Sequence, residues 1–131
     1  MSAPRSDQEW REKLGEERYY ICRKGGTEPP FTGALLAEKR PGTFHCAGCG
    51  AALFSSAAKY DSGSGWPSFF DRVKDAPITE IRDESLGMVR VELRCGACDS
   101  HLGHLFPDGP APTGQRYCVN SLSLTFEPES S

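Results

Sequence analysis

The sequence lacks the features of several protein classes. No apolar run approaches the roughly 18 residues that a membrane-spanning helix needs. The stretch from Met1 to Arg11 is polar and charged, without the apolar segment of a signal peptide. Fifteen basic and eighteen acidic residues leave a net charge of −3, which is too balanced for nucleic-acid binding through bulk positive charge. We therefore expect a cytoplasmic, globular protein that acts on neither membranes nor nucleic acid.

Histidine is scarce, with three residues in 131, whereas six cysteines, fourteen glycines and ten prolines are present. The many glycines and prolines favour turns and short strands over long helices. The length predicts one domain over residues 1–131. Because no export signal is evident, the cysteines indicate metal binding or redox chemistry rather than a disulfide scaffold. Function should therefore be sought among the cysteines and histidines.

Regular elements follow from periodicity and from helix-start signals. A capping box at Ser6–Glu9 predicts a short amphipathic helix over about 7–18. Alternating apolar residues predict a half-buried hairpin over 78–93, and a further strand over 115–126. Residues 127–131 are expected to be a frayed tail. These signals together predict a mainly β domain with antiparallel strands.

Two C-x2-C hooks carry four of the six cysteines, Cys46 with Cys49 and Cys95 with Cys98. Two such turns supply the four thiolates that a tetrahedral zinc ion prefers, and a saturated zinc is structural rather than catalytic. We therefore predict one structural zinc per chain, acting as a clasp. Two dithiol–disulfide couples are the alternative. His101, three residues after Cys98, is a conceivable ligand in place of one cysteine.

Cys118 is a candidate nucleophile. It lies within the predicted strand over 115–126, with Arg116 and Asn120 on the same face. A nearby guanidinium favours the reactive thiolate, and the Asn120 amide can donate to an oxygen or orient a water. Taken alone, a buried cysteine that only packs is the commoner outcome for such a position.

A histidine pair and a tryptophan complete the candidate site. His101 and His104 lie beside the second cysteine hook, and imidazole is well matched to proton transfer near neutral pH. His104 is the preferred proton donor, and a structural role remains open for at least one of the pair. Trp66 lies in a glycine-rich stretch, where its ring can wall a small apolar pocket or simply pack in the core.

These segments occur together in a recognisable order. In chain order they are Gly26-Thr27-Glu28 with Pro30-Phe31, the first hook, Gly65-Trp66-Pro67-Ser68-Phe69, the second hook, His101-x-Gly103-His104-x-Phe106, and Arg116-Tyr117-Cys118-x-Asn120. From about Glu17 to Phe126, the chain resembles the R-stereospecific (B-type) methionine sulfoxide reductases. Enzymes of this class reverse one epimer of oxidised methionine.

The resemblance implies two antiparallel sheets with a short N-terminal helix and a zinc clasp. It implies that the zinc is held by Cys46, Cys49, Cys95 and Cys98. It also implies that Cys118 attacks the sulfoxide, that Trp66 contacts its methyl group, and that the remaining site residues surround the substrate and its oxygen. These remaining residues are His101, His104, Phe106, Arg116 and Asn120. Oxidised proteins are the implied substrates, thioredoxin the implied final reductant, and the expected state is a monomer.

One position departs from the family pattern. Many members carry a resolving cysteine in the glycine-rich loop, where this chain has Ser64. Cys22 is then the only thiol left to attack an oxidised Cys118, and direct reduction by an external thiol is the alternative route. Two other functions compete with the reductase. One is a zinc module that binds protein or RNA, and the other is a thiol–disulfide oxidoreductase that uses one hook.

Overall fold

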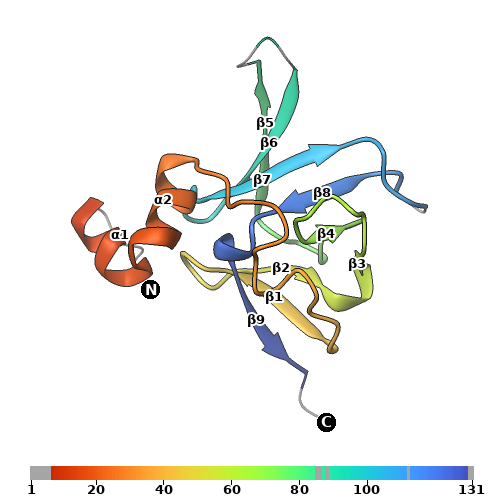
Figure 1. The fold of residues 1–131 in the computed structure, drawn as a ribbon, viewed down its shortest axis with the longest axis horizontal. Coiled ribbons are helices and arrows are strands. Elements are labelled where there is room, and N and C mark those ends of the chain that lie inside the picture. Colours follow the sequence, from red (N-terminus) through yellow and green to blue (C-terminus); the bar gives the residue numbers. More distant parts are fainter. Residues whose placement is uncertain (1–6, 85–86, 88, 112, 130–131) are drawn as a thin grey trace.

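The architecture consists of two antiparallel sheets (Figure 1), in a computed structural model that describes residues 7–84, 87, 89–111 and 113–129. The three-stranded sheet has the order β2-β1-β9, with β1 at Gly42–Cys46, β2 at Ala52–Ser55 and β9 at Leu124–Pro128. The six-stranded sheet has the order β3-β4-β8-β7-β6-β5. Its strands are β3 at Lys59–Tyr60, β4 at Ser68–Phe69, β5 at Ile78–Asp83, β6 at Arg90–Cys95, β7 at His101–Phe106 and β8 at Arg116–Val119. The predicted fold class is confirmed.

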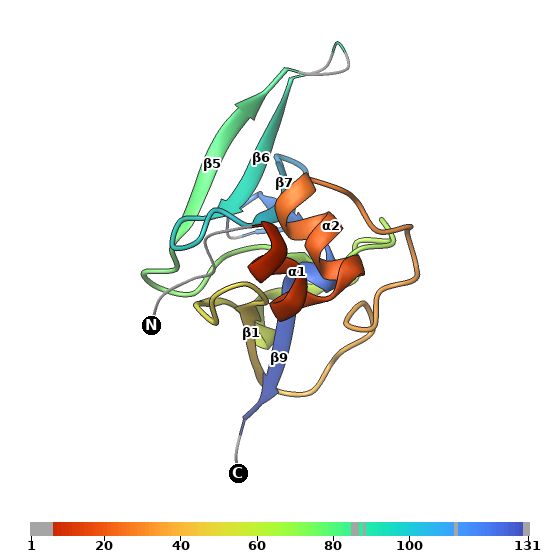
Figure 2. The same ribbon diagram turned by 90° about the vertical axis from the view of Figure 1, so that its left-hand side faces the viewer.

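Two helices replace the single N-terminal helix predicted over 7–18. α1 spans Asp7–Leu14 and α2 spans Glu16–Lys24, with Gly15 between them at a φ of 82°. A positive φ is readily accessible to glycine, and the chain changes direction here between the two helices. Cys22 therefore lies within α2 rather than in a segment after the helix. The predicted capping box depends on Ser6, which lies outside the described residues. Both helices lie together on one side of the molecule (Figure 2), and no helix in the described part of the chain has the length and apolarity to cross a bilayer.

The predicted strand over 115–126 is two strands in different sheets. β8 ends at Val119, a 3-10 turn, η3, occupies Ser121–Ser123, and β9 begins at Leu124 in the three-stranded sheet. The prediction of one continuous strand is wrong. Both halves are extended and amphipathic, so the alternation continues across them, but it does not show that the chain passes from one sheet to the other. β9 also includes two residues of the predicted tail, since Glu127 pairs with Thr43. The hairpin predicted over 78–93 is confirmed as β5 and β6.

Aromatic side chains fill the space between the sheets. Phe54 of β2 stacks on Phe69 of β4, with ring centroids 4.3 Å apart and planes 10° apart. Phe44 of β1 meets the same ring edge-on at 5.1 Å. All three side chains are fully buried, and such aromatic pairs add to the stabilisation from burial alone. This core fixes the six-stranded sheet against the three-stranded one, so the opposite, half-buried face of β7 and β8 is held in a constant position.

Candidate active site and metal centre

A cavity lies where β7 and β8 pair. In the register of these strands, Cys118 is directly opposite His104, and Arg116 is directly opposite Phe106. Side chains of directly opposed residues share a face of the sheet, with Cβ atoms about 5 Å apart. The cavity has a volume of about 260 Å³ and is lined by Thr27, Ser64, Trp66, Arg90, Gly103, His104, Phe106, Arg116, Cys118, Val119 and Asn120. The structure thus brings together six of the residues singled out from the sequence.

The Cys118 thiol is subject to opposing effects. Burial raises its pKa, while a hydrogen bond with Ser64 at 3.8 Å and the nearby Arg116 guanidinium lower it; burial prevails, so the pKa lies above its ordinary value. The predicted favourable effect of Arg116 is present but does not dominate the substrate-free site. Asp108 holds that guanidinium through two contacts, at 2.8 and 3.3 Å, and Phe106 lies 4.3 Å beneath it. The guanidinium is thereby fixed beside the thiol.

Two residues that sequence reasoning missed, Asp83 and Arg90, form an ion pair beside His104. The Nε2 atom of His104 lies 3.5 Å from the Asp83 carboxylate of β5, which also pairs with Arg90 of β6 at 3.3 Å. Burial, Arg90 and His101 together lower the pKa of His104. The imidazole is therefore neutral at neutral pH while no substrate is bound. Asp83 and Arg90 lie far along the chain from the histidine motif, and no signal in the sequence marked them.

His101 lies next to His104 but outside the cavity. The pairing of β6 with β7 shifts register at Leu93–Arg94, and an extra residue of this kind returns His101 to the face that carries His104. The two ring centroids are 5.7 Å apart, which confirms that the imidazoles lie close together. His101 Nδ1 contacts the Glu92 carboxylate at 2.7 Å. The His101 side chain therefore lies beside the His104 ring and does not line the cavity.

Trp66 is oriented by a polar chain that begins at Asn120. The Trp66 indole donates to the Glu28 carbonyl at 2.9 Å, and the Glu28 backbone N–H donates to the Asn120 side-chain oxygen at 3.0 Å. Asn120 Nδ2 in turn donates to the Leu102 carbonyl at 3.1 Å. The Glu28 carboxylate, 3 % exposed, accepts from the Leu122 N–H at 2.9 Å. Asn120 therefore orients Trp66 as well as lining the cavity. Glu28, in the Gly26–Glu28 segment that the sequence singled out, has a structural role as the link between these two residues.

Ser64, at the position of the family's resolving cysteine, and Cys22, the remaining candidate for that role, lie in different places. Ser64 lines the cavity, and its hydroxyl also accepts from Ser62 at 2.8 Å, so the glycine-rich loop reaches Cys118. Cys22 is 2 % exposed and does not line this cavity. It borders a separate depression of about 210 Å³ together with His101. Burial raises the pKa of the Cys22 thiol to about 11.

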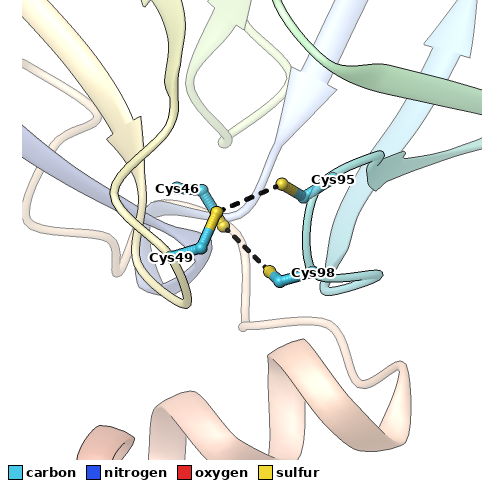
Figure 3. Close-up of side chains that lie close together, drawn as sticks. All are labelled: Cys46, Cys49, Cys95 and Cys98. Carbon is cyan, nitrogen blue, oxygen red and sulfur yellow. Dashed lines mark hydrogen bonds between the residues drawn. The ribbon is translucent and has the colours of Figure 1, made fainter. Parts of the chain in front are cut away.

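The four hook cysteines converge on one point between the sheets (Figure 3). All four sulfur atoms lie within 4.8 Å of one another. The Cys46–Cys98 and Cys49–Cys95 sulfur pairs are each 3.6 Å apart, and a tetrahedral zinc with bonds of about 2.3 Å would set its sulfurs about 3.8 Å apart. The donor set and its spacing therefore fit a metal ion, consistent with zinc. His101, bound to Glu92, takes no part in this cluster.

The cluster joins distant parts of the fold. Cys46 ends β1 and Cys49 lies in the turn that follows it in one sheet, while Cys95 ends β6 and Cys98 lies in the turn that follows it in the other. α2 reaches the same point, because Arg23 donates to the Cys98 carbonyl at 2.8 Å. Hydrogen bonding to Cys95 and Cys98 and burial raise the pKa of the Cys46 thiol, so its thiolate form is disfavoured in the metal-free site. A bound cation would reverse this effect, because it stabilises thiolates. An ion here would clasp both sheets.

Comparisons with known proteins agree with this geometry. The family model described as the SelR domain matches residues 14–128. A Pseudomonas aeruginosa protein named "Peptide methionine sulfoxide reductase MsrB" is 60% identical over 122 residues, which cover 93% of this chain and 92% of that protein. An Escherichia coli protein of the same name is 56% identical over 126 residues, covering 96% and 92%. The chain therefore belongs to the MsrB family of peptide methionine sulfoxide reductases.

Proposed function

We propose that this protein reduces the R epimer of methionine sulfoxide in oxidised proteins, with the free amino acid as a second substrate. The observation that carries the proposal is the pairing of Cys118 with His104 in one cavity walled by Trp66. Methionine sulfoxide presents an electrophilic sulfur, a polar oxygen and an apolar methyl group. A thiol, an imidazole and an indole are complementary to these three features.

The reaction uses these side chains in turn. Trp66 holds the methyl group, and the oxygen lies toward His104 and Asn120, so only one epimer directs its sulfur at Cys118. The proton of the Cys118 thiol passes to the sulfoxide oxygen by way of His104, and the Cys118 sulfur bonds to the sulfoxide sulfur. The protonated oxygen then moves from the substrate sulfur to the Cys118 sulfur, so that the bond between the two sulfurs and the substrate S–O bond both break. One thiol and one sulfoxide yield one sulfenic acid and one thioether, with no net change in protons.

The Arg116 guanidinium stabilises the negative charge that develops on Cys118 as its proton leaves. Its fixed pairing with Asp108 supports this role, because the charge is already oriented before substrate arrives. Asp83 and Glu92 orient the two imidazoles, which keeps the proton path in place. His101 acts through His104 and not by touching substrate.

The metal is proposed to be a single structural zinc. Cys46, Cys49, Cys95 and Cys98 would hold it, and four thiolates leave no position for substrate. What zinc supplies here is folding free energy, because it joins two turns of different sheets.

Thioredoxin is proposed to reduce the sulfenic acid on Cys118 directly. Two properties of Cys22 argue against the internal route: it is 2 % exposed, and its pKa of about 11 leaves little thiolate for attack. Cys118, in contrast, is only partly buried. None of the six cysteines is paired in a disulfide, which fits the reducing compartment that we propose, the cytoplasm. We further propose that the chain acts as a monomer in the repair of proteins after oxidative stress.

An assay with resolved R and S epimers of N-acetyl-methionine sulfoxide, with dithiothreitol as reductant, tests the function. We expect turnover of the R epimer and essentially none of the S epimer. Equal turnover of both epimers would refute the stereochemical role of Trp66, and no turnover of either would refute the reaction itself.

A further inference from the structure

A second cavity adjoins the catalytic one and shares Trp66 with it. Its volume is about 450 Å³, and its walls include Phe31, Leu36, Lys59, Tyr60, Gly65 and Trp66. We call it the flanking groove. The long connection from α2 to β1 carries Phe31, and the connection from β3 to β4 carries Gly65 and Trp66 (Figure 1). Because Trp66 lines both cavities, a chain whose side chain fills the first can continue into the second.

Phe31 occupies an unusual position at this groove. Its side chain is 68 % exposed, more than Tyr20 or Val89, the other exposed large apolar side chains in the described part of the protein. Its φ of 66° lies in the left-handed region, where an aromatic residue is strained. Its N–H donates to the Gly65 carbonyl at 2.7 Å. The backbone therefore holds an aromatic ring in solvent, at a conformational cost that packing within the chain does not explain.

Gly65 makes this placement possible. Its φ is 95°, and a Cβ at this position would lie 2.6 Å from the Pro30 side chain and 3.1 Å from the Phe31 ring. The ring thus seats against the bare backbone of the glycine-rich loop, one residue from Trp66. An exposed aromatic fixed at the rim of a cavity is typical of a surface that binds an apolar partner.

Four charged side chains line the flanking groove, the acidic Glu38 and Asp61 and the basic Lys39 and Lys59, so its lining carries no net charge. Lys59 donates to the Leu36 carbonyl at 2.6 Å, and Glu38 pairs with Arg40 at 2.8 Å. Because the two acidic and two basic groups balance, the groove favours an uncharged, apolar occupant.

We propose that the flanking groove binds the residue adjacent to the oxidised methionine in a polypeptide substrate and prefers a large apolar side chain there. The inference rests on the proposed function, because the occupant is an extension of the sulfoxide substrate. Phe31 and Tyr60 form the contact surface, and Trp66 separates the neighbouring side chain from the reacting sulfoxide.

The test compares two peptides that contain one methionine R-sulfoxide, flanked on both sides by leucine in one and by glycine in the other, with dithiothreitol as reductant. The measured quantity is the ratio of their kcat/KM values. We expect the wild type to favour the leucine peptide by about five- to tenfold, the effect of burying part of an apolar side chain, and Phe31→Gly to bring the ratio near one. Glycine suits the left-handed backbone at this position, so Phe31→Gly should also fold, with an unchanged or higher Tm.

Tyr20→Ala is the matched control, since it removes an exposed aromatic on α2 and should leave the ratio unchanged. Damage to the loop would slow both peptides and leave the ratio as it was. A ratio near one in the wild type, or an equal ratio in wild type and Phe31→Gly, would overturn the inference. An unchanged ratio with a raised KM for thioredoxin would assign the groove to the reductant instead. Failure to reduce either peptide would instead refute the proposed function, so the two failures are distinct.

Discussion

Replacing Ser64 by cysteine should convert the oxidised enzyme from a sulfenic acid into an intramolecular disulfide. The Ser64 hydroxyl lies 3.8 Å from the Cys118 sulfur, and a disulfide bond is about 2.05 Å long, so the atoms must approach by roughly 1.8 Å. Gly63 and Gly65 flank the position at φ values of 75° and 95°. A loop with glycines on both sides can make this adjustment at low cost.

The magnitude follows from loop closure. A bond between positions 64 and 118 closes a loop of about 55 residues, for which the chain-entropy model gives about 4 kcal/mol of stabilisation. For a domain of this size, that corresponds to a rise in Tm of roughly 15 °C, reduced by any strain that the bond introduces. The oxidised variant should therefore melt well above its dithiothreitol-treated form, whereas the wild type should not.

The assay adds one equivalent of R-sulfoxide without reductant, and then counts thiols after zinc removal and denaturation. We expect the count to fall by one in the wild type, through the sulfenic acid, and by two in Ser64→Cys. Peptide mapping should recover the fragments of positions 64 and 118 linked. The double variant Ser64→Cys with Cys118→Ser is the control and should lose no thiol.

A Ser64→Cys enzyme that accumulates sulfenic acid on Cys118, with the new thiol still open to alkylation, would refute the reasoning. Such a result would mean that the glycine-rich loop does not reach the nucleophile during turnover. A wild type that loses two thiols and yields a Cys22–Cys118 peptide would show that the internal route operates after all.

Four further outcomes are expected. Cys118→Ser should abolish sulfoxide reduction while leaving metal content and Tm unchanged, and residual turnover would place the nucleophile elsewhere. Cys95→Ser should lose the metal, measured by elemental analysis, and with it the folded state, because structural zinc contributes about 10 kcal/mol or more, comparable to the whole stability of a domain; full metal content and Tm would contradict the clasp. Arg116→Leu should raise the pKa of Cys118 further, since it removes a positive charge that lowers this pKa. The rate at which iodoacetamide labels Cys118 should then rise only at a higher pH than in the wild type or in the control Arg82→Leu, and coincident pH profiles would exclude the guanidinium effect. Cys22→Ser should retain thioredoxin-supported turnover, and its loss would restore Cys22 as the resolving thiol.

The features that sequence predicts well here are local. The hairpin of β5 and β6 alternates over a few residues, and each cysteine hook is one tight turn, so neighbours along the chain suffice to identify them. The same holds for Arg116 and Cys118, which share a face because they are two residues apart on one strand.

The features that sequence misses depend on contacts between distant segments. Nothing in the period-two pattern reveals that the chain changes sheets between Val119 and Leu124. The placement of His101 follows from a register shift against β6, and its spacing from His104 alone does not define which side it faces. Asp83 reaches His104 only because β5, β6 and β7 pair side by side. Partners of this kind are set by the sheet, not by a motif.

The metal cluster and the catalytic pair are connected through β7. Cys98 lies in the turn that leads into this strand, and its sulfur is 3.1 Å from the Ser100 hydroxyl, immediately before His101. A strand whose first residues are fixed by a clasp has little freedom to change register, and a shift of one residue would turn His104 away from Cys118. The ion would therefore act on catalysis without touching substrate. The second hook and the histidine motif lie close together in the sequence, so a metal ion at the hook would set the register in which His104 faces Cys118, the proposed nucleophile.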